Sequence, residues 1–376
     1  MDEIDRWSNI HRDILKEIAK HFYSYDDFIQ LQLVCKQWSL KLPEISNEIL
    51  WLLIPDEESS STHHIYEDEE IYHLMQLPIA DEVTVEIQGL EEQGIPHLML
   101  RDMHDNVICG SYNEWLIIMS ITEGSMYMLN AFTKVHLDLP QISTNTDLVW
   151  KVIINSCPDS DDKDFMAVAI YGPRYRLAFY RPNNKRWLKI KFSTRRPSYF
   201  RDVIFFEEKI YAINSDGQPY KFDTKTNSRP VGGIHEAKPP SDVDAGSYKF
   251  RYLMGCSNGS LLMLVRYFSR EMLHTCNFDI YELKKNAKEW HRIQSLGNYV
   301  LMIGPSFSVQ MLPARLFQGK GNRIYFTDYY LEFKWNDYVD THDIGIFDLN
   351  NGSCQRLLSD VNFVSTPVWC YPNSVL

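Results

Sequence analysis

The chain has 376 residues, of which 44% are hydrophobic and 13% aromatic, enough for one large domain and a small one. Its 38 Lys and Arg and 50 Asp and Glu leave a net charge of -12. This charge argues against a nucleic-acid partner, because little would be gained from releasing phosphate counterions. No apolar stretch is long enough to span a bilayer, and the N-terminus lacks the apolar run of a signal peptide. We therefore expect no nucleic-acid partner and no membrane partner.

The cysteines indicate the compartment. Seven Cys are scattered along the chain without a Cys-x-x-Cys pair, so neither a disulfide framework nor a zinc site is expected. The pair His63–His64 is the alternative metal ligand, but paired histidines without convergent ligands are usually solvated. We expect no cofactor, no metal ion and a location in the cytoplasm and/or nucleus, where thiols stay reduced.

Two short helices are predicted near the N-terminus. Apolar residues recur there at the helical period, on one face: Ile10, Ile14, Leu15, Ile18 and Phe22. Asp26 or Asp27 is a suitable N-cap for the second helix, because its carboxylate can accept the free N–H groups of the first turn. About forty residues cannot bury all these side chains, and surplus apolar surface indicates a partner site. A helical hairpin that only caps the next domain is the alternative.

The same residues resemble the F-box, a helical motif that binds the Skp adaptor of Skp–cullin–F-box ubiquitin ligases. The matches run in order through Asp13–Leu15, Glu17–Ile18, Asp26–Phe28 and Val34–Trp38. Ile10–His11 stands where the family has Leu-Pro, so the proline that pre-sets helix entry is missing. The resemblance implies an F-box helical domain over residues 5–54, with adaptor-binding residues Ile10, Ile14, Leu15, Ile18, Val34, Cys35 and Trp38.

Residues 55–72 are predicted to be an acidic, Ser-rich linker. Between residues 56 and 70 only Ile65 and Tyr66 are suited to burial, so the segment cannot offset the entropy lost on ordering. The rest of the chain, residues 75–376, is predicted to be one β-domain that folds without the helical module.

Short strands separated by tight turns fill that domain, so the fold class is mainly β with a small α N-terminal module. Asn258–Gly259 between two apolar runs is the strongest hairpin signal, because both turn residues tolerate positive φ. Similar runs flank Glu207–Glu208 and Glu123–Gly124. Runs of this kind predict antiparallel hairpins rather than long helices.

A loose repeat suggests how the strands are arranged. Units of an aromatic strand and a polar turn recur at a spacing of roughly 40–60 residues, which suits a β-propeller. Two of the units carry a tryptophan at the same offset, Trp187 and Trp290. Six blades fit the length best, with seven as the alternative, and a β-sandwich or irregular barrel is the other fold considered. We expect the last strand, near Val368–Tyr371, to close the domain by pairing with its N-terminal side.

This region also resembles the kelch-like propeller of a plant F-box family, a domain long catalogued without a function. The resemblance runs in the family's order from residue 96 to 370. Its main matching stretches are Pro96–Leu100, Gly110–Ser111 with Trp115–Leu116, Leu129–Thr133 with Leu137–Pro140, Asp202–Ile204 with Ile210–Ala212, Gly259–Leu262, Ser295–Gly297 with Ile303–Gly304, Asn322–Asp328 and Thr366–Trp369. Ala131 replaces the family's usual proline, a change that we expect only to loosen a turn.

One motif suggests catalysis. Gly255–Gly259 matches Gly-x-Ser-x-Gly, but a nucleophile elbow needs a helix after the serine, whereas Leu261–Val265 is typical of a strand. The sequence contains no phosphate loop, no His-Glu-x-x-His and no dinucleotide fingerprint. We therefore predict a recognition subunit rather than an enzyme.

The two resemblances together imply a substrate receptor of a ubiquitin ligase. The F-box would dock the Skp adaptor, and through it the cullin and RING subunits, while the propeller binds an unknown target protein for ubiquitination. Two alternatives stay open: a propeller hydrolase with an accessory helical hairpin, and an adaptor-bound scaffold that delivers no target. The net charge of -12 predicts a target with a basic patch.

Overall fold

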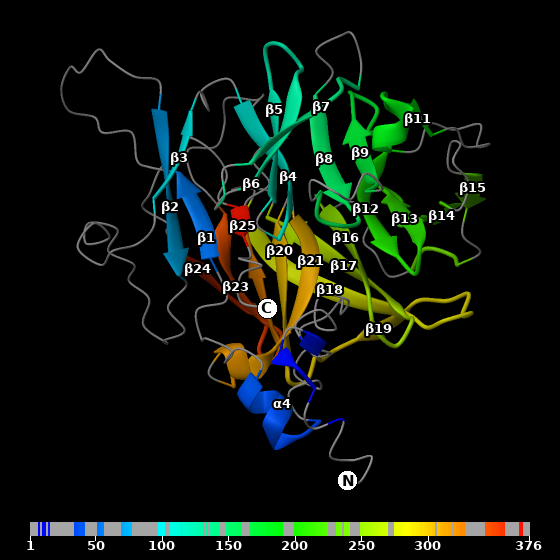
Figure 1. The fold of residues 1–376 in the computed structure, drawn as a ribbon. Coiled ribbons are helices and arrows are strands. Elements are labelled where there is room, and N and C mark those ends of the chain that lie inside the picture. The colour runs from blue at the N-terminus through cyan, green and yellow to red at the C-terminus, as the bar shows by residue number, and fades with distance from the viewer. Residues whose placement is uncertain are drawn as a thin grey trace, which may run out of the picture.

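The structure is a computed structural model that describes part of the chain in detail. The described residues are 7, 10–12, 14–15, 34–41, 51–55, 69–76, 97–101, 106–113, 115–130, 133, 135–142, 148–158, 165–190, 199–224, 231–234, 237–240, 249–269, 274–304, 307–317, 319–327, 343–357 and 368–370. They contain six β-sheets (Figure 1).

Four of these sheets consist of four consecutive antiparallel strands each. In chain order the strands are β4 (Asn106–Tyr112), β5 (Trp115–Ser120), β6 (Met126–Asn130) and β7 (His136–Leu139); β8 (Val149–Ile154), β9 (Ala167–Tyr171), β10 (Arg176–Tyr180) and β11 (Leu188–Lys189); β12 (Phe200–Phe206), β13 (Lys209–Asn214), β14 (Pro219–Asp223) and β15 (Val231–Ile234); and β16 (Lys249–Gly255), β17 (Leu261–Phe268), β18 (Thr275–Leu283) and β19 (His291–Ile293). A short 3-10 helix, η3 (Pro182–Asn184), lies between β10 and β11.

The other two sheets are less regular. One has the order β21-β20-β22-β23-β24, from β20 (Tyr299–Gly304), β21 (Phe307–Pro313), β22 (Arg323–Phe326), β23 (Ile344–Asp348) and β24 (Ser353–Leu357). In it β20 and β22 are parallel, and the 3-10 helix η4 (Ala314–Phe317) precedes β22. The other has the order β25-β1-β2-β3, from β25 (Val368–Cys370), β1 (Trp51–Pro55), β2 (Glu69–Gln76) and β3 (His97–Arg101).

Five of the six sheets, β4 to β24, are the blades of a β-propeller. Their inner strands β4, β8, β12, β16 and β21 contact one another in succession, and β4 is also in contact with β21 and β25. The ring of inner strands is therefore closed. Gly110 shows how closely they approach, since a Cβ atom on Gly110 of β4 would lie 2.3 Å from the carbonyl oxygen of Val152 in β8.

The number of regular blades differs from the expectation. Five blades are built from consecutive strands, β4 to β24, where six or seven were predicted. One reason is that the fifth blade takes five strands, because β20 and β21 form an inner hairpin before β22. The other is that the sheet β25-β1-β2-β3 combines both ends of the chain instead of repeating the unit.

The predicted pairing of the last strand with the N-terminal side of the domain is confirmed. The sheet formed by this pairing, however, extends beyond the predicted limits of the domain. β25 pairs with β1 in antiparallel register, Leu53 with Val368 and Trp51 with Cys370. β1 lies within the residues expected for the helical domain (5–54), and β2 overlaps the expected linker (55–72). The propeller sheet therefore begins at Trp51 and not at residue 75, because an apolar run read as the end of the helical module pairs as a strand.

The core lies between neighbouring blades. Successive residues of an inner strand face opposite neighbours, so Val152 packs with the β4–β7 blade while Ile153 packs towards β12–β15. Strands covered on both faces become continuous apolar runs, as in β5, where all six residues are buried. This packing explains why the strands showed little alternation of polar and apolar residues.

Candidate functional site

The candidate adaptor-docking site comprises residues at the N-terminal end of the described chain. The helix α4 (Lys36–Lys41) projects below the propeller (Figure 1). Of the seven predicted adaptor-binding residues, Ile18 lies outside the described residues, as does most of the expected helical domain. The other six are described.

Two hydrogen bonds join α4 to the first residues of the chain. The indole Nε1 of Trp38 donates to the carbonyl oxygen of Trp7 at 2.6 Å, and Lys41 Nζ donates to the carbonyl oxygen of Ile10 at 2.9 Å. Because each bond spans 31 residues of sequence, the start of the predicted motif and its Val-Cys-Lys-x-Trp ending lie against each other.

Burial divides the predicted residues into two groups. Leu15 and Trp38 are buried, at 0% and 6% exposure, so they form the interior of the module. Ile14 and Val34 are 55% and 59% exposed, and Ile10 and Cys35 are partly buried. Trp7 is 65% exposed, although the motif comparison did not include it among the docking residues. Its position directly before the predicted helix face was the signal that could have identified it.

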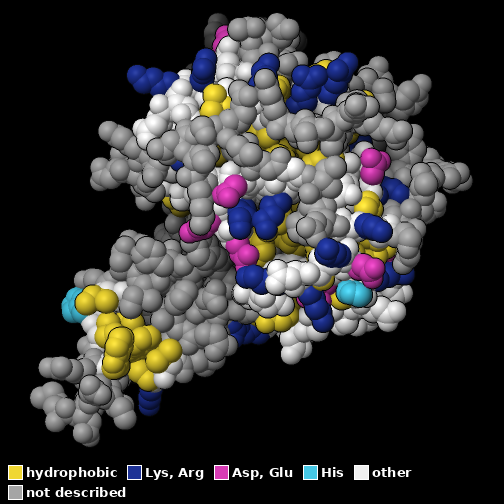
Figure 2. Space-filling model, turned by 90° about the vertical axis from the view of Figure 1, so that its right-hand side faces the viewer, with side chains coloured by type: hydrophobic (Ala, Val, Ile, Leu, Met, Phe, Trp, Pro, Cys, Tyr) yellow, Lys and Arg dark blue, Asp and Glu magenta, His cyan; other side chains and the backbone are white. Residues whose placement is uncertain are grey.

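We call Trp7, Ile14 and Val34 the docking patch. Figure 2 shows hydrophobic side chains gathered on the lower, projecting part of the molecule, at the level of α4 in Figure 1. Large apolar side chains left in water on a small module indicate a surface that a partner covers.

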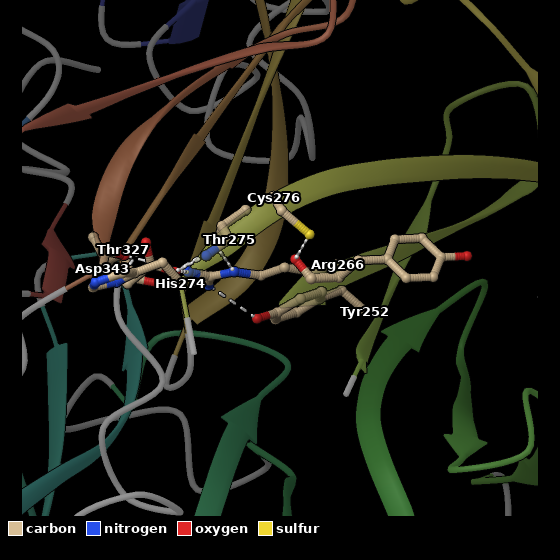
Figure 3. Close-up of polar contacts among 8 residues, drawn as sticks. Tyr252, Arg266, His274, Thr275, Cys276, Thr327 and Asp343 are labelled. Carbon is tan, nitrogen blue, oxygen red and sulfur yellow. Dashed lines mark hydrogen bonds and ion pairs between the residues drawn. The ribbon is translucent and has the colours of Figure 1, made fainter. Parts of the chain in front are cut away.

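A buried polar network lies between two blades of the propeller (Figure 3). Arg266 in β17, fully buried, forms an ion pair with Asp343 at 2.9 Å and donates to the carbonyl oxygen of Thr327 at 2.8 Å. The backbone N–H and the hydroxyl of Thr275 both donate to the same Asp343 oxygen, at 2.8 and 2.5 Å. Through these bonds the blade β16–β19 is joined to the residues that end β22 and precede β23.

The arginine and the aspartate of this network remain charged although both are buried. Burial by itself lowers the pKa of Arg266, but Tyr252 and Asp343 raise it overall, so the guanidinium stays protonated. Burial raises the pKa of Tyr252, which therefore stays neutral. His274 Nδ1 lies 3.8 Å from Asp343, and both side chains are about as buried as the arginine. These groups interact with one another and connect two blades.

A second buried ion pair joins three inner strands. Lys151 Nζ in β8 lies 2.7 Å from Asp202 in β12, and both residues are almost inaccessible. Asp202 also accepts the backbone N–H groups of Val203 and of Leu253 in β16, at 2.8 and 2.7 Å. A carboxylate with three donors is well compensated for the loss of water.

The Gly-x-Ser-x-Gly match is a hairpin, as predicted. Ser257 is exposed in the turn between β16 and β17, and Gly259 has φ +81°. Burial raises the pKa of the neighbouring Cys256, so its thiol is not an activated nucleophile. A strand follows this serine where a nucleophile elbow needs a helix.

Comparison with known proteins identifies the propeller. The model of the KIB1-4 beta-propeller family matches residues 86–348. The chain belongs to this family. Two Arabidopsis thaliana relatives are F-box proteins by name: At4g17565 is 21% identical over 94% of this chain and 90% of its own, and At4g22060 is 22% identical over 99% and 98%.

Likeness to solved structures is weaker. A chain of the S. cerevisiae Dbp5–Nup159–Gle1 complex gives a TM-score of 0.36 at 8% identity, covering 68% of this chain and 65% of its own. The Cps50 (Swd1) β-propeller domain of Myceliophteria thermophila gives 0.34 at 11% identity, covering 68% and 86%. At such scores neither protein is used to infer function.

The described residues contain neither a membrane-spanning helix nor a metal-binding cluster. Among them no helix has the length and apolar character to cross a membrane. The described His, Cys, Asp and Glu side chains form no group of three or more that could hold a metal ion.

Proposed function

We propose that this KIB1-4 propeller protein is the substrate-receptor subunit of a Skp–cullin–F-box ubiquitin ligase. The observation that carries the proposal is the docking patch, exposed apolar surface on a module whose two segments match the F-box. The names of the Arabidopsis relatives support it. The cullin and RING subunits would then be reached through the Skp adaptor.

The predicted residues take two roles in this proposal. Ile14 and Val34, together with Trp7, contact the adaptor, because they are the exposed ones. Leu15 and Trp38 hold the two segments together, because they are buried and Trp38 bonds to Trp7. Ile10, Cys35 and Ile18 complete the set of adaptor-binding residues.

The propeller in this proposal is non-catalytic. Its part is to hold a target protein near the ubiquitin-charged enzyme, so that transfer becomes effectively intramolecular. Cys35, Cys109, Cys157, Cys256, Cys276 and Cys354 are free thiols, as is usual in the cytoplasm or nucleus.

The test is co-purification with the Skp adaptor. Ile14→Asp/Val34→Asp in the full-length protein places two charges in the proposed contact, and we expect adaptor binding to fall at least about tenfold, as for loss of an interface anchor. Val135→Asp is the matched control, because Val135 is a similarly exposed valine (52%) on the propeller. Equal adaptor recovery from both variants would contradict the proposal.

A second experiment separates a receptor from a scaffold. Proteins retained with the adaptor-bound complex are tested as substrates in reconstituted ubiquitination. A receptor transfers ubiquitin to a retained protein only when both the docking patch and the propeller are intact. A scaffold retains partners but supports no transfer.

A further inference from the structure

The charge of this chain is divided between two segments. Residues 56–100 contain twelve Asp and Glu and no Lys or Arg, which equals the whole net charge of -12. Residues 171–201 contain ten Lys and Arg and no Asp or Glu. The overall charge therefore does not describe the surface that the propeller presents.

Part of this positive segment lies at one end of the blade β8–β11. Arg174 and Arg176 are exposed at the turn between β9 and β10, and Arg201 is partly exposed near the start of β12. Among the described residues no ion pair involves Arg174 or Arg176. Figure 2 shows mostly Lys and Arg among the charged side chains in its upper part, at the level of β8–β11 in Figure 1.

Aromatic rings lie close to one of these arginines, Arg201. Trp150 and Tyr175 are stacked, with ring centroids 4.7 Å apart, and Tyr175 meets Tyr199 edge-on at 6.3 Å. The guanidinium of Arg201 lies 5.0 Å from the ring centre of Tyr175. Tyr199 remains 41% exposed. We call Trp150, Arg174, Tyr175, Arg176, Tyr199 and Arg201 the Arg–aromatic face.

The backbone holds this face in place. Tyr175 has φ 47°, a left-handed conformation that is uncommon for a residue with a side chain. Its carbonyl oxygen accepts the N–H of Phe200, and Trp150 Nε1 donates to the carbonyl oxygen of Gly172 at 2.9 Å. Rings fixed before binding lose little entropy when a partner arrives. The nearby turn of the next blade contributes one exposed acid, Asp216, against the three arginines.

We propose that the Arg–aromatic face binds an acidic segment of the target protein, one that carries an aromatic side chain among its carboxylates. This deepens the proposed receptor function and rests on it for the identity of the cargo. Exposed guanidinium groups pair bidentately with carboxylates, and the Tyr175–Tyr199 pair offers an edge for the aromatic side chain. The inference reverses the expectation of a basic target, which rested on net charge alone.

A protein segment fits better than a nucleic acid. This face offers three described arginines, so it could neutralise only a few phosphates of a nucleic-acid strand. A short acidic peptide needs only a local match of charge.

The test is direct binding to the full-length protein, measured with and without the Skp adaptor added. The probe is a fluorescent synthetic peptide of Asp and Glu with one central Phe, and its neutral counterpart carries Asn and Gln. We expect Arg174→Glu/Arg176→Glu to weaken binding of the acidic probe about tenfold or more. The matched control is Arg186→Glu/Lys189→Glu, which makes the same charge change at exposed residues after η3 and on the outer strand β11. We expect this control to change the affinity for the acidic probe less than about twofold.

Further arms test the chemistry. Tyr199→Ser should weaken binding, whereas Tyr199→Phe should retain it, because the ring rather than the hydroxyl makes the contact. Raising the salt from about 0.1 M to 1 M should weaken binding, since the screening length falls from about 10 Å to 3 Å.

The outcomes separate the two proposals. Equal loss in both charge-reversal variants, or equal affinity for the neutral peptide, would overturn the acidic-segment proposal. So would tighter binding of an oligouridylate of the same net charge. Adaptor recovery is measured on the same samples: its loss without loss of peptide binding would point to failure of the receptor proposal, and not of this one.

Discussion

At the scale of single residues, Arg266 shows how the propeller tolerates a charge in its interior. It is fully buried, and its bonds reach Thr275 in its own blade and Thr327 and Asp343 in the next. Removing one partner of a buried ion pair leaves the other charge uncompensated, which is far costlier than losing a surface pair.

Asp343→Asn should therefore destabilise the protein by about 3–5 kcal/mol, because the amide keeps the shape but not the charge facing Arg266. The measurement is the free energy of unfolding from urea denaturation followed by circular dichroism. Asp138→Asn is the control, since the Asp138 side chain is 89% exposed, and its midpoint should match the parent protein. A parent-like midpoint for Asp343→Asn would show that the network does not brace the blades.

At the scale of elements, the turn between β12 and β13 is made of residues poorly suited to it. Glu207 and Glu208 have φ values of 45° and 55°, the left-handed conformation that a two-residue hairpin turn of type I′ requires. Asn and Gly are the usual residues there, because side chains with a Cβ are strained at positive φ. The apolar strands on both sides of the turn impose the hairpin regardless.

Glu208→Gly should then stabilise the protein by about 0.5–1 kcal/mol, since glycine removes that strain. It leaves Glu207 free to keep its bond to Lys285, and the carbonyl oxygen of residue 208 can still accept the hydroxyl of Thr224. Glu289→Gly is the matched control: Glu289 is exposed without a positive φ, so glycine there only adds freedom to the unfolded chain and should lower the melting temperature. A lower melting temperature for Glu208→Gly as well would contradict the assignment of a type I′ turn.

At the scale of the whole molecule, the two ends of the chain pair in one sheet that contacts the first and the fifth blade. β25 supplies Trp369, which is 1% exposed and donates from Nε1 to the carbonyl oxygen of Ile303 in the fifth blade. β1 supplies the strand that β25 pairs with. The propeller is therefore complete only when residues from 51 onward and the last strand are both present.

Deleting residues 365–376 should lower the melting temperature of the propeller by well over about 5 °C, because it removes a strand and a buried tryptophan. A fragment of residues 48–376 should fold, whereas residues 77–376, which lack β1 and β2, should fold poorly. The melting temperature and the protease resistance of these truncated proteins are measured beside those of the parent protein. An equally stable 77–376 fragment would show that the sheet of β25 is dispensable.

The sequence alone was sufficient for most strands and hairpins of blades β4–β24. Their apolar runs and the Asn258–Gly259 and Glu123–Gly124 turns are local signals, and the structure confirms the hairpins. It was also sufficient to predict that Val368–Tyr371 closes the domain. The role of Trp51–Pro55 was wrong, because an apolar run of five residues does not reveal whether it ends a helical module or pairs with a distant strand.

Within the candidate sites, sequence determined residue types and tertiary structure determined their roles. Leu15 and Ile14 are neighbours with the same apolar character, yet Leu15 is buried and Ile14 is 55% exposed, a difference that arises only in the folded chain. Arg266 and Asp343 lie 77 residues apart, and Trp150, Tyr175 and Tyr199 come from separate strands and turns. Strands and turns follow from local periodicity and φ preferences, whereas such contacts exist only once the ring of blades has closed.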